Sequence, residues 1–256
     1  MGSNYIDLPH DVAVDVFDSV YICGSYSQTV DFDPGTGVDE RTSFGASDFF
    51  LAKFHSVGDY LWAYTRGGEK GDDCYSVDVG IQGNVYITGD FQESVDFSPL
   101  AGMEIHTSEG QADAFLVKLD IYGEYQWART WGSKNEDYGF GVAVDSTDHV
   151  YVAGYFLGET DFDPGPGNTI YSPTGGLDCF TSRFNTLGDF DWVATWGSTY
   201  DDIAYGIDTN SNDDVIVTGK FAGSVDFLPG VFEDIHTASG DTDIFVLKIL
   251  KNGQWY

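Results

Sequence analysis

A short segment with the pattern x-Asp-Phe-x-Pro occurs four times in this chain, and successive copies are 65 residues apart. The same interval separates glycines, aspartates and phenylalanines elsewhere, without an insertion. A period of this kind marks a tandem repeat, in which each unit packs on its neighbours. The chain therefore forms one domain, 1–256, with units at approximately 1–65, 66–130, 131–195 and 196–256. The four segments are Val30–Pro34, Val95–Pro99, Thr160–Pro164 and Val225–Pro229.

Each unit reads as a series of short strands. In the second unit, residues 75–79 and 84–88 flank a turn at Gln82-Gly83, and residues 115–119 and 125–129 flank a turn at Tyr122-Gly123. A short extended piece is expected around Ile105. A four-stranded meander repeated in tandem is typical of a β-propeller blade. We predict an all-β fold, a β-propeller built from four tandem 65-residue four-stranded blades.

Composition narrows the function classes. The chain carries 42 acidic against 11 basic residues, a formal net charge of −31, which opposes binding to nucleic acid and to anionic lipid. The 32 glycines and 7 prolines are too evenly spread for long helices. No apolar run approaches the roughly 20 residues of a membrane span, and we expect no signal peptide in the chain. The three cysteines have no metal or redox spacing and are expected to be buried thiols.

Three phrases of the third and second units carry a family resemblance. They resemble the SBBP-type bacterial β-propeller repeat over essentially the whole chain. Repeats with the Asp-Phe-Asp-Pro-Gly loop are similar to those of large secreted or surface proteins, which generally lack an assigned activity. The resemblance implies a propeller fold and an extracellular or cell-surface location, and it implies no reaction. The phrases are residues 145–154, 113–120 and 127–132.

Three positions of the repeat are aspartate in all four units, and blade topology places them on one face as an acidic loop face. Our preferred interpretation is that these carboxylates accept hydrogen bonds from backbone amides at turns. The alternative is Ca²⁺ binding, because this cation takes six to eight oxygen ligands. The fixed aspartates are Asp7, Asp72, Asp137 and Asp202, then Asp31, Asp96, Asp161 and Asp226, then Asp48, Asp113, Asp178 and Asp243. The candidate calcium ligands are Asp31, Asp33, Asp48, Asp96, Asp113, Asp161, Asp163, Asp178, Asp226 and Asp243.

Other repeated positions are expected to be structural. A basic residue recurs as Lys53, Lys118, Arg183 and Lys248, for which we predict cross-strand or inter-blade ion pairs. Five of the six tryptophans follow the period, which favours packing between blades over a glycan-stacking surface. His106 and His236 share one position two units apart and would face each other in a closed ring. We expect rim residues there, with a metal or proton site as the alternative.

The near identity of the units argues against catalysis, which needs unlike acids or a nucleophile in one pocket. We predict a non-catalytic scaffold or binding module with a glycan or protein partner and optional calcium. A lectin-like propeller or a glycan-active enzyme is the alternative function. The ring could close in two ways. A monomeric four-bladed ring is preferred, and a homodimer forming an eight-bladed ring is the second arrangement.

Overall fold

The structure is a computed structural model that describes residues 2–3, 5–98, 104–229 and 232–255. Pro99 of the second Asp-Phe-x-Pro segment lies outside this part of the chain. The described residues form strands joined by turns, with no helix and hence no helix that could cross a membrane. The predicted all-β class is confirmed. We call the sheet built from each unit's long strands a main sheet, numbered 1 to 4 along the chain.

Main sheets 1 to 3 each contain four antiparallel strands, and main sheet 4 contains three in the described residues. Sheet 1 consists of β1 (Leu8–Val14), β2 (Val20–Tyr26), β5 (Asp48–Phe54) and β6 (Tyr60–Arg66). Sheet 2 consists of β7 (Asp73–Val79), β8 (Val85–Phe91), β11 (Asp113–Leu119) and β12 (Tyr125–Trp131). Sheet 3 consists of β13 (Tyr138–Val144), β14 (Val150–Phe156), β17 (Asp178–Phe184) and β18 (Phe190–Trp196). Sheet 4 consists of β19 (Ile203–Thr209), β20 (Val215–Phe221) and β23 (Asp243–Ile249).

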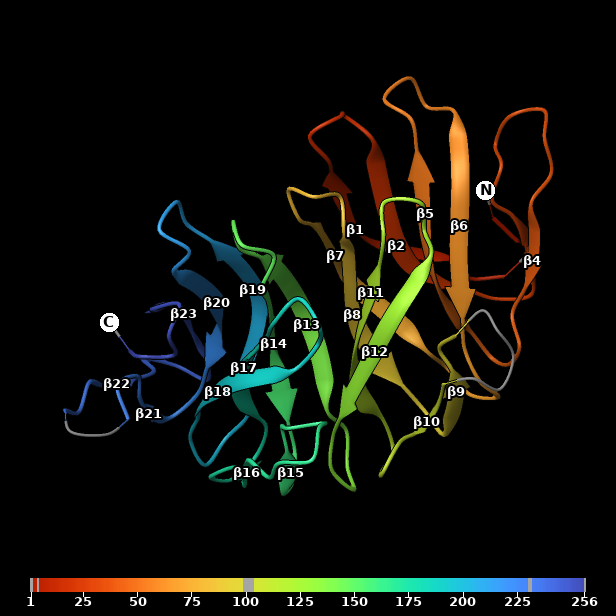
Figure 1. The fold of residues 1–256 in the computed structure, drawn as a ribbon. Helices are drawn as coiled ribbons and strands as arrows, with labels where there is room; N and C mark the ends of the chain where they lie inside the picture. Colours follow the sequence, from red (N-terminus) through yellow and green to blue (C-terminus); the bar gives the residue numbers. More distant parts are fainter. Residues whose placement is uncertain (1, 4, 99–103, 230–231, 256) are drawn as a thin grey trace.

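Each unit adds a small hairpin between its second and third long strands. The sequence predicted an extended piece near Ile105, and the structure pairs it with the strand that precedes the Asp-Phe-x-Pro loop. Figure 1 shows β9, β10, β15 and β16 at one end of the sheets, opposite the turns that join the first two long strands. The hairpins are β3 (Thr29–Asp31) with β4 (Glu40–Thr42), β9 (Ser94–Asp96) with β10 (Ile105–Thr107), β15 (Thr160–Asp161) with β16 (Ile170–Tyr171), and β21 (Ser224–Asp226) with β22 (Ile235–Thr237).

The main sheets pack face to face in chain order, and the first strands β1, β7, β13 and β19 lie next to one another. Phe49 of sheet 1 stacks on Phe115 of sheet 2 with ring centroids 4.7 Å apart. Both faces of β11 are buried, because sheet 2 lies between sheets 1 and 3. Hydrophobic burial between neighbouring sheets is therefore the main source of stability, as expected for a repeat array.

The ends of the array do not show the closed ring that the sequence favoured. Figure 1 places sheet 1 and sheet 4 at opposite sides of the molecule. Val12 and Val14 of β1 are 59% and 58% exposed, and Ile244 and Val246 of β23 are 85% and 72% exposed. Closure within one chain would cover these apolar side chains, as neighbours cover the equivalent positions of sheets 2 and 3. The exposure of these apolar side chains therefore argues against the ring closure that the sequence favoured.

Candidate functional site

The carboxylates of the fixed aspartates accept hydrogen bonds from backbone amides and join neighbouring segments of the chain. Asp72 accepts hydrogen bonds from the Gly68 amide at 2.6 Å and the Gln92 amide at 2.9 Å, which ties the end of sheet 1 to the loop after β8. Asp31 accepts the Asp33 amide at 3.0 Å and the Asp39 amide at 2.9 Å within its own loop. All twelve fixed aspartates accept at least one backbone amide in this way. The preferred interpretation of these positions is confirmed.

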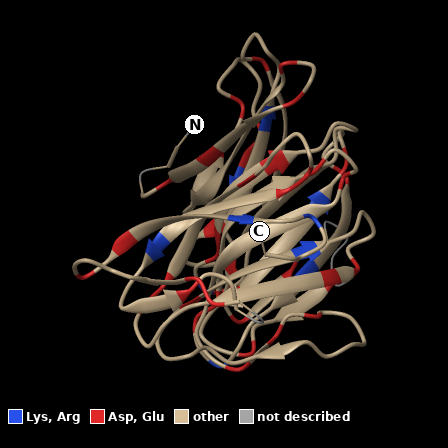
Figure 2. Cartoon of the chain, turned by 90° about the vertical axis from the view of Figure 1, so that its left-hand side faces the viewer, with Lys and Arg blue, Asp and Glu red and all other residues tan. Residues whose placement is uncertain are grey.

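The acidic loop face that the sequence predicted is weakened by the burial of many of its aspartates. Six of the twelve fixed aspartates are almost fully buried, so they contribute little to a charged surface. Figure 2 shows acidic residues at both ends of the sheets. The acidity is thus distributed over the molecule rather than gathered on one face. The six buried residues are Asp48, Asp72, Asp113, Asp137, Asp178 and Asp202.

Burial also shifts the protonation of these acids. Removal from water, with a further contribution from Asp48, raises the pKa of Asp72 to about 7. The pKa of Asp113 is raised to about 7 by burial and by neighbouring Asp137, and that of Asp178 to about 6 by burial and by Asp202. Asp72 and Asp113 can therefore hold a proton near neutral pH, and Asp178 can hold one in slightly more acidic solution.

The candidate calcium ligands accept hydrogen bonds from backbone amides of their own turns and loops. Within the described residues, no group of three or more His, Cys, Asp or Glu side chains is arranged to hold a metal ion. In the first loop, Asp33 accepts the Gly35 amide at 2.7 Å, and in the third, Asp163 accepts the Gly165 amide at 2.8 Å. These loops are thus closed by local hydrogen bonds. Calcium binding stays a prediction from the sequence.

The repeated cations form the ion pairs that the sequence predicted. Lys53 lies 3.4 Å from Asp15 within sheet 1, whereas Lys118 reaches across to Asp148 of sheet 3 at 3.9 Å. The difference follows from Gly80, which occupies the Asp15 position in sheet 2. An added Cβ on Gly80 would lie 1.9 Å from the Asp148 carboxylate, so glycine provides the space for the inter-sheet pair. The other two pairs join Arg183 to Asp145 and Lys248 to Asp214.

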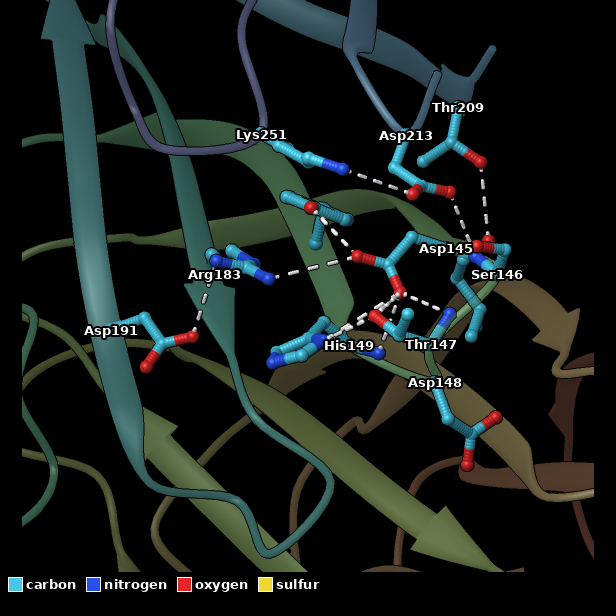
Figure 3. Close-up of polar contacts among 12 residues, drawn as sticks. Asp145, Ser146, Thr147, Asp148, His149, Arg183, Asp191, Thr209, Asp213 and Lys251 are labelled. Atoms are coloured by element: carbon cyan, nitrogen blue, oxygen red, sulfur yellow. Dashed lines mark hydrogen bonds and ion pairs between the residues drawn. The ribbon is translucent and has the colours of Figure 1, made fainter. Parts of the chain in front are cut away.

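Figure 3 shows how completely one such turn is bonded. Asp145 accepts hydrogen bonds from Thr147 at 2.7 and 2.8 Å and from the His149 amide at 3.0 Å, and it lies 3.7 Å from Arg183. Burial alone would raise the pKa of Asp145, but these hydrogen bonds hold it below its ordinary value. In the next unit, Asp213 accepts the Ser146 amide at 3.1 Å and joins sheets 3 and 4. The charged residues of this turn therefore stabilise the turn itself and the contact between sheets 3 and 4.

Tryptophan packs between sheets, as predicted. The Trp62 ring lies against Gly123, whose added Cβ would approach the ring within 2.8 Å, and Trp127 lies in the same way against Gly188. Both glycines have positive φ, near 80°, at the turn before the last strand of the unit. Glycine is required there for the turn and for the close approach of the indole.

A row of aromatic side chains along the first strands is the feature that sequence reasoning missed. Each first strand has a β-bulge, and the residue at the bulge is His10, Tyr75, Phe140 or Tyr205. Successive ring centroids are 5.2, 5.0 and 5.5 Å apart. A bulge re-aims a side chain out of the normal alternation of a strand. We call these four residues the aromatic row. The sequence does contain a signal for the aromatic row, because its four positions are 65 residues apart and all carry rings.

A buried carboxyl lies beside the aromatic row. Asp90 is 2% exposed and is directly opposite Asp73 in the β7–β8 pair. Burial and the charge of Asp73 raise the pKa of Asp90 well above its ordinary value, while a hydrogen bond from Tyr75 acts in the opposite direction. The same burial isolates Asp90 from a substrate, so it fits a structural role better than that of a general acid. In the aromatic row itself, His10 and Tyr205 are exposed, and Tyr75 and Phe140 are partly exposed.

The two histidines of one repeat position do not meet. His106 in β10 is half-buried, contacts the Thr130 hydroxyl at 2.8 Å and lies 3.6 Å from Glu104. His236 in β22 is exposed and lies 3.0 Å from Asp234. Figure 1 places β10 and β22 far apart. The facing pair expected for a closed ring is therefore wrong for this structure. The cysteines are buried and unpaired, as predicted: Cys23, Cys74 and Cys179.

Comparison with known proteins gives distant relatives. No family model matches the chain. It is 28% identical over 171 residues to the regulatory protein FlaEY of Caulobacter vibrioides, a match that covers 67% of this chain and 17% of that protein. It is 26% identical over 183 residues to the uncharacterized WD repeat-containing protein L264 of Acanthamoeba polyphaga mimivirus, covering 64% of this chain and 13% of that protein. The chain thus spans less than a fifth of either relative.

The chain also matches several solved structures, one of which is the following. It is a protein of unknown function from Bacteroides caccae, with a TM-score of 0.42 and 8% identity, and the match covers 97% of this chain and 80% of that one.

Proposed function

We propose that this chain is a propeller-type repeat module that binds a protein partner and has no catalytic activity of its own. The repeated four-stranded sheets and the similarity to a WD repeat-containing protein support the propeller type. The four-blade count, the SBBP-type family and the extracellular or cell-surface location rest on the repeat and its resemblance. The observation that carries binding is the aromatic row, a continuous strip of rings across four strands.

The aromatic row has the chemistry of a protein interface. Aromatic side chains are enriched in interface hot spots because they combine large apolar area with a few polar atoms. Tyr205 is 48% exposed and His10 is also exposed, so both ends of the row are accessible. A net charge of −31 attracts cationic partners and repels acidic ones. We therefore propose that the partner presents a basic segment with apolar or aromatic side chains.

The absence of catalysis is proposed from the use of the polar residues. The fixed aspartates hold backbone amides and the repeated cations hold aspartates, so their charges are committed to the fold. The units are also nearly equivalent, whereas a general acid and a general base need unlike surroundings. A glycan-active enzyme would require one unit to differ in its polar residues.

A peptide array of graded net charge tests the proposal. We expect labelled protein to bind basic peptides that contain aromatic residues, and Tyr205→Ser to weaken this binding about tenfold, as expected for loss of one interface anchor. Phe44→Ser is the matched control, because Phe44 is 84% exposed in the loop before β5 and lies outside the aromatic row. Equal binding by both variants, or binding to a glycan array alone, would contradict the proposal.

Calcium stabilisation belongs to the same proposal and has a separate test. Buried acids such as Asp113 and Asp137 repel each other when both are ionised, and a cation between the loops would relieve this. A site filled at 100 times its dissociation constant adds about 2.7 kcal/mol to the free energy of unfolding. Thermal melts with CaCl₂ and with chelator should then differ by several degrees. Identical melts would exclude calcium.

A further inference from the structure

A groove lies between the small hairpins of neighbouring units, and two copies of it differ in size and chemistry. The copy between units 1 and 2, which we call groove 1, has a volume of about 840 Å³. The copy between units 2 and 3, groove 2, has a volume of about 390 Å³. Residues 65 apart line both, so the two grooves are equivalent. The shared positions include Thr42 and Thr107, Asp48 and Asp113, Asp96 and Asp161, and Ile105 and Ile170.

Groove 1 is lined by an arginine where groove 2 has a tryptophan. Trp131 ends β12 and packs on Phe180 of sheet 3, with ring centroids 6.0 Å apart. In sheet 1 the equivalent ring comes from the neighbouring strand, because Phe49 lies directly opposite Arg66. Phe49 stacks on Phe115, the counterpart of Phe180, at 4.7 Å. The contact between sheets 1 and 2 therefore needs no aromatic ring at position 66.

The Arg66 guanidinium brings hydrogen-bond donors to groove 1 that the protein does not fully use. Its Nη1 atom donates to the Thr65 carbonyl at 2.6 Å, and its Nε atom is buried without an acceptor in the described residues. Seven of the 11 basic residues form ion pairs in the described part of the chain, and Arg66 is not among them. A donor-rich cation without an ion pair in so acidic a chain indicates an external acceptor.

The other lining residues of groove 1 supply acceptors and an apolar surface. Glu40 and Glu69 are exposed, and the Phe44 and Ile105 side chains are 84% and 61% exposed. A matching ligand needs acceptors for Arg66, donors for the carboxylates and an apolar face for Phe44. Each hydroxyl group of a sugar both donates and accepts, and the C–H faces of a sugar ring suit an aromatic side chain. The net charge of −31 opposes an anionic ligand.

We propose that groove 1 binds a neutral oligosaccharide. Arg66 donates to its hydroxyl oxygens, Glu40 and Glu69 accept from its hydroxyl groups, and Phe44 packs against a sugar ring. A volume of about 840 Å³ lies in the range of pockets for drug-sized ligands, which favours an oligosaccharide over a single sugar. No residue of the aromatic row lines this groove, so the inference goes beyond the proposed protein partner and does not depend on it.

Groove 2 provides an internal comparison for this proposal. Glu109 and Trp131 hold the positions of Phe44 and Arg66, and Trp131 is only 3% exposed. Groove 2 therefore has carboxylate acceptors without the guanidinium and without an exposed ring, and we expect it to bind no oligosaccharide. The charged residues that line it are all acidic: Glu109, Asp113, Glu159, Asp161 and Asp163.

An array of neutral and of uronic-acid-containing oligosaccharides is the probe. We expect the 256-residue chain to bind neutral members, and we expect Arg66→Met to weaken binding of the strongest neutral member about tenfold and Phe44→Ser about fivefold. Lys134→Met is the matched control, because Lys134 is an exposed cation that lines neither groove. No binding, binding of uronic-acid members alone, or equal loss in the control would overturn the proposal.

Further variants separate this site from the aromatic row and from a loss of folding. Arg66→Lys keeps the charge without the planar fork, and we expect it to weaken binding about threefold while the thermal melt stays unchanged. Tyr205→Ser should leave oligosaccharide binding intact, so this proposal and the proposed protein partner can fail separately. Raising NaCl from about 50 to 500 mM should change the affinity less than about twofold, because a neutral ligand carries no charge to screen. Loss of oligosaccharide binding in Tyr205→Ser would place the ligand on the aromatic row and overturn the proposal.

Discussion

Strands β11 and β23 hold the same position in their units and have similar sequences, yet their surroundings differ. β11 reads DAFLVKL and is buried at all seven residues, whereas β23 reads DIFVLKI and is open on one face. Ala114 and Leu116 are fully buried, while their counterparts Ile244 and Val246 are 85% and 72% exposed. The more apolar strand is thus the more exposed one. In this molecule, the neighbouring sheet decides burial and the strand's own sequence does not.

Truncation of Leu116 in β11 and of its counterpart Val246 in β23 should give the largest difference between the two strands. We expect Leu116→Ala to lower the free energy of unfolding by about 2–5 kcal/mol, because it removes buried contacts and leaves a cavity. Val246→Ala should change it by less than about 0.5 kcal/mol, because the side chain is mostly in water. Urea unfolding of both variants measures the difference. Similar losses would show that another chain covers β23 in solution.

Asp113 and Asp178 begin the third long strands of sheets 2 and 3, and they should make the free energy of unfolding depend on pH. Asp113 and Asp178 are 3% and 4% exposed, and burial raises their pKa values to about 7 and about 6. A raised pKa means that the folded chain binds more protons than the unfolded chain between about pH 4 and 7. The free energy of unfolding should therefore fall as pH rises through this range, by an amount on the order of 2 kcal/mol for Asp113.

Amide substitutions measure the two contributions separately. Asp113→Asn should remove more of the pH dependence than Asp178→Asn, because the Asp113 pKa is raised further. The amide keeps an oxygen that can accept the Glu109 backbone hydrogen bond. Urea unfolding between pH 5 and 8 provides the measurement. Stability that rises with pH in the wild-type chain would contradict the assigned sign.

The sequence was sufficient for features that follow from period and alternation. The 65-residue interval predicted the repeated sheets, and the fixed aspartates, the cations and Trp127 were correctly interpreted as structural. Their partners were harder to predict. Lys118 bonds to the next sheet because Gly80 leaves a gap, which is a property of two units in contact. A single unit contains the cation but not the space that directs it.

The end sheets and the aromatic row were less predictable for a different reason. Strand alternation assigns each residue to one of two faces, and a β-bulge breaks that rule at Tyr75 and Tyr205. The period alone shows that rings recur but not where they point. The expected ring closure likewise depended on the curvature between neighbouring sheets, which no residue pattern reports. Sequence reasoning was therefore strongest within a unit and weakest between units.

The two histidines test the comparison between the second and fourth units, and here we expect the smallest effect on stability. His106 and His236 share a tripeptide, but within the described residues His106 contacts Thr130 of β12 at 2.8 Å and His236 contacts Asp234 at 3.0 Å. His106→Ala should lower the free energy of unfolding by about 1 kcal/mol, because it removes a half-buried hydrogen bond and leaves the Thr130 hydroxyl unpaired. His236→Ala should change it by less than about 0.5 kcal/mol. Thermal unfolding resolves the difference, and an equal loss in both variants would contradict the structural role assigned to the contact between His106 and Thr130.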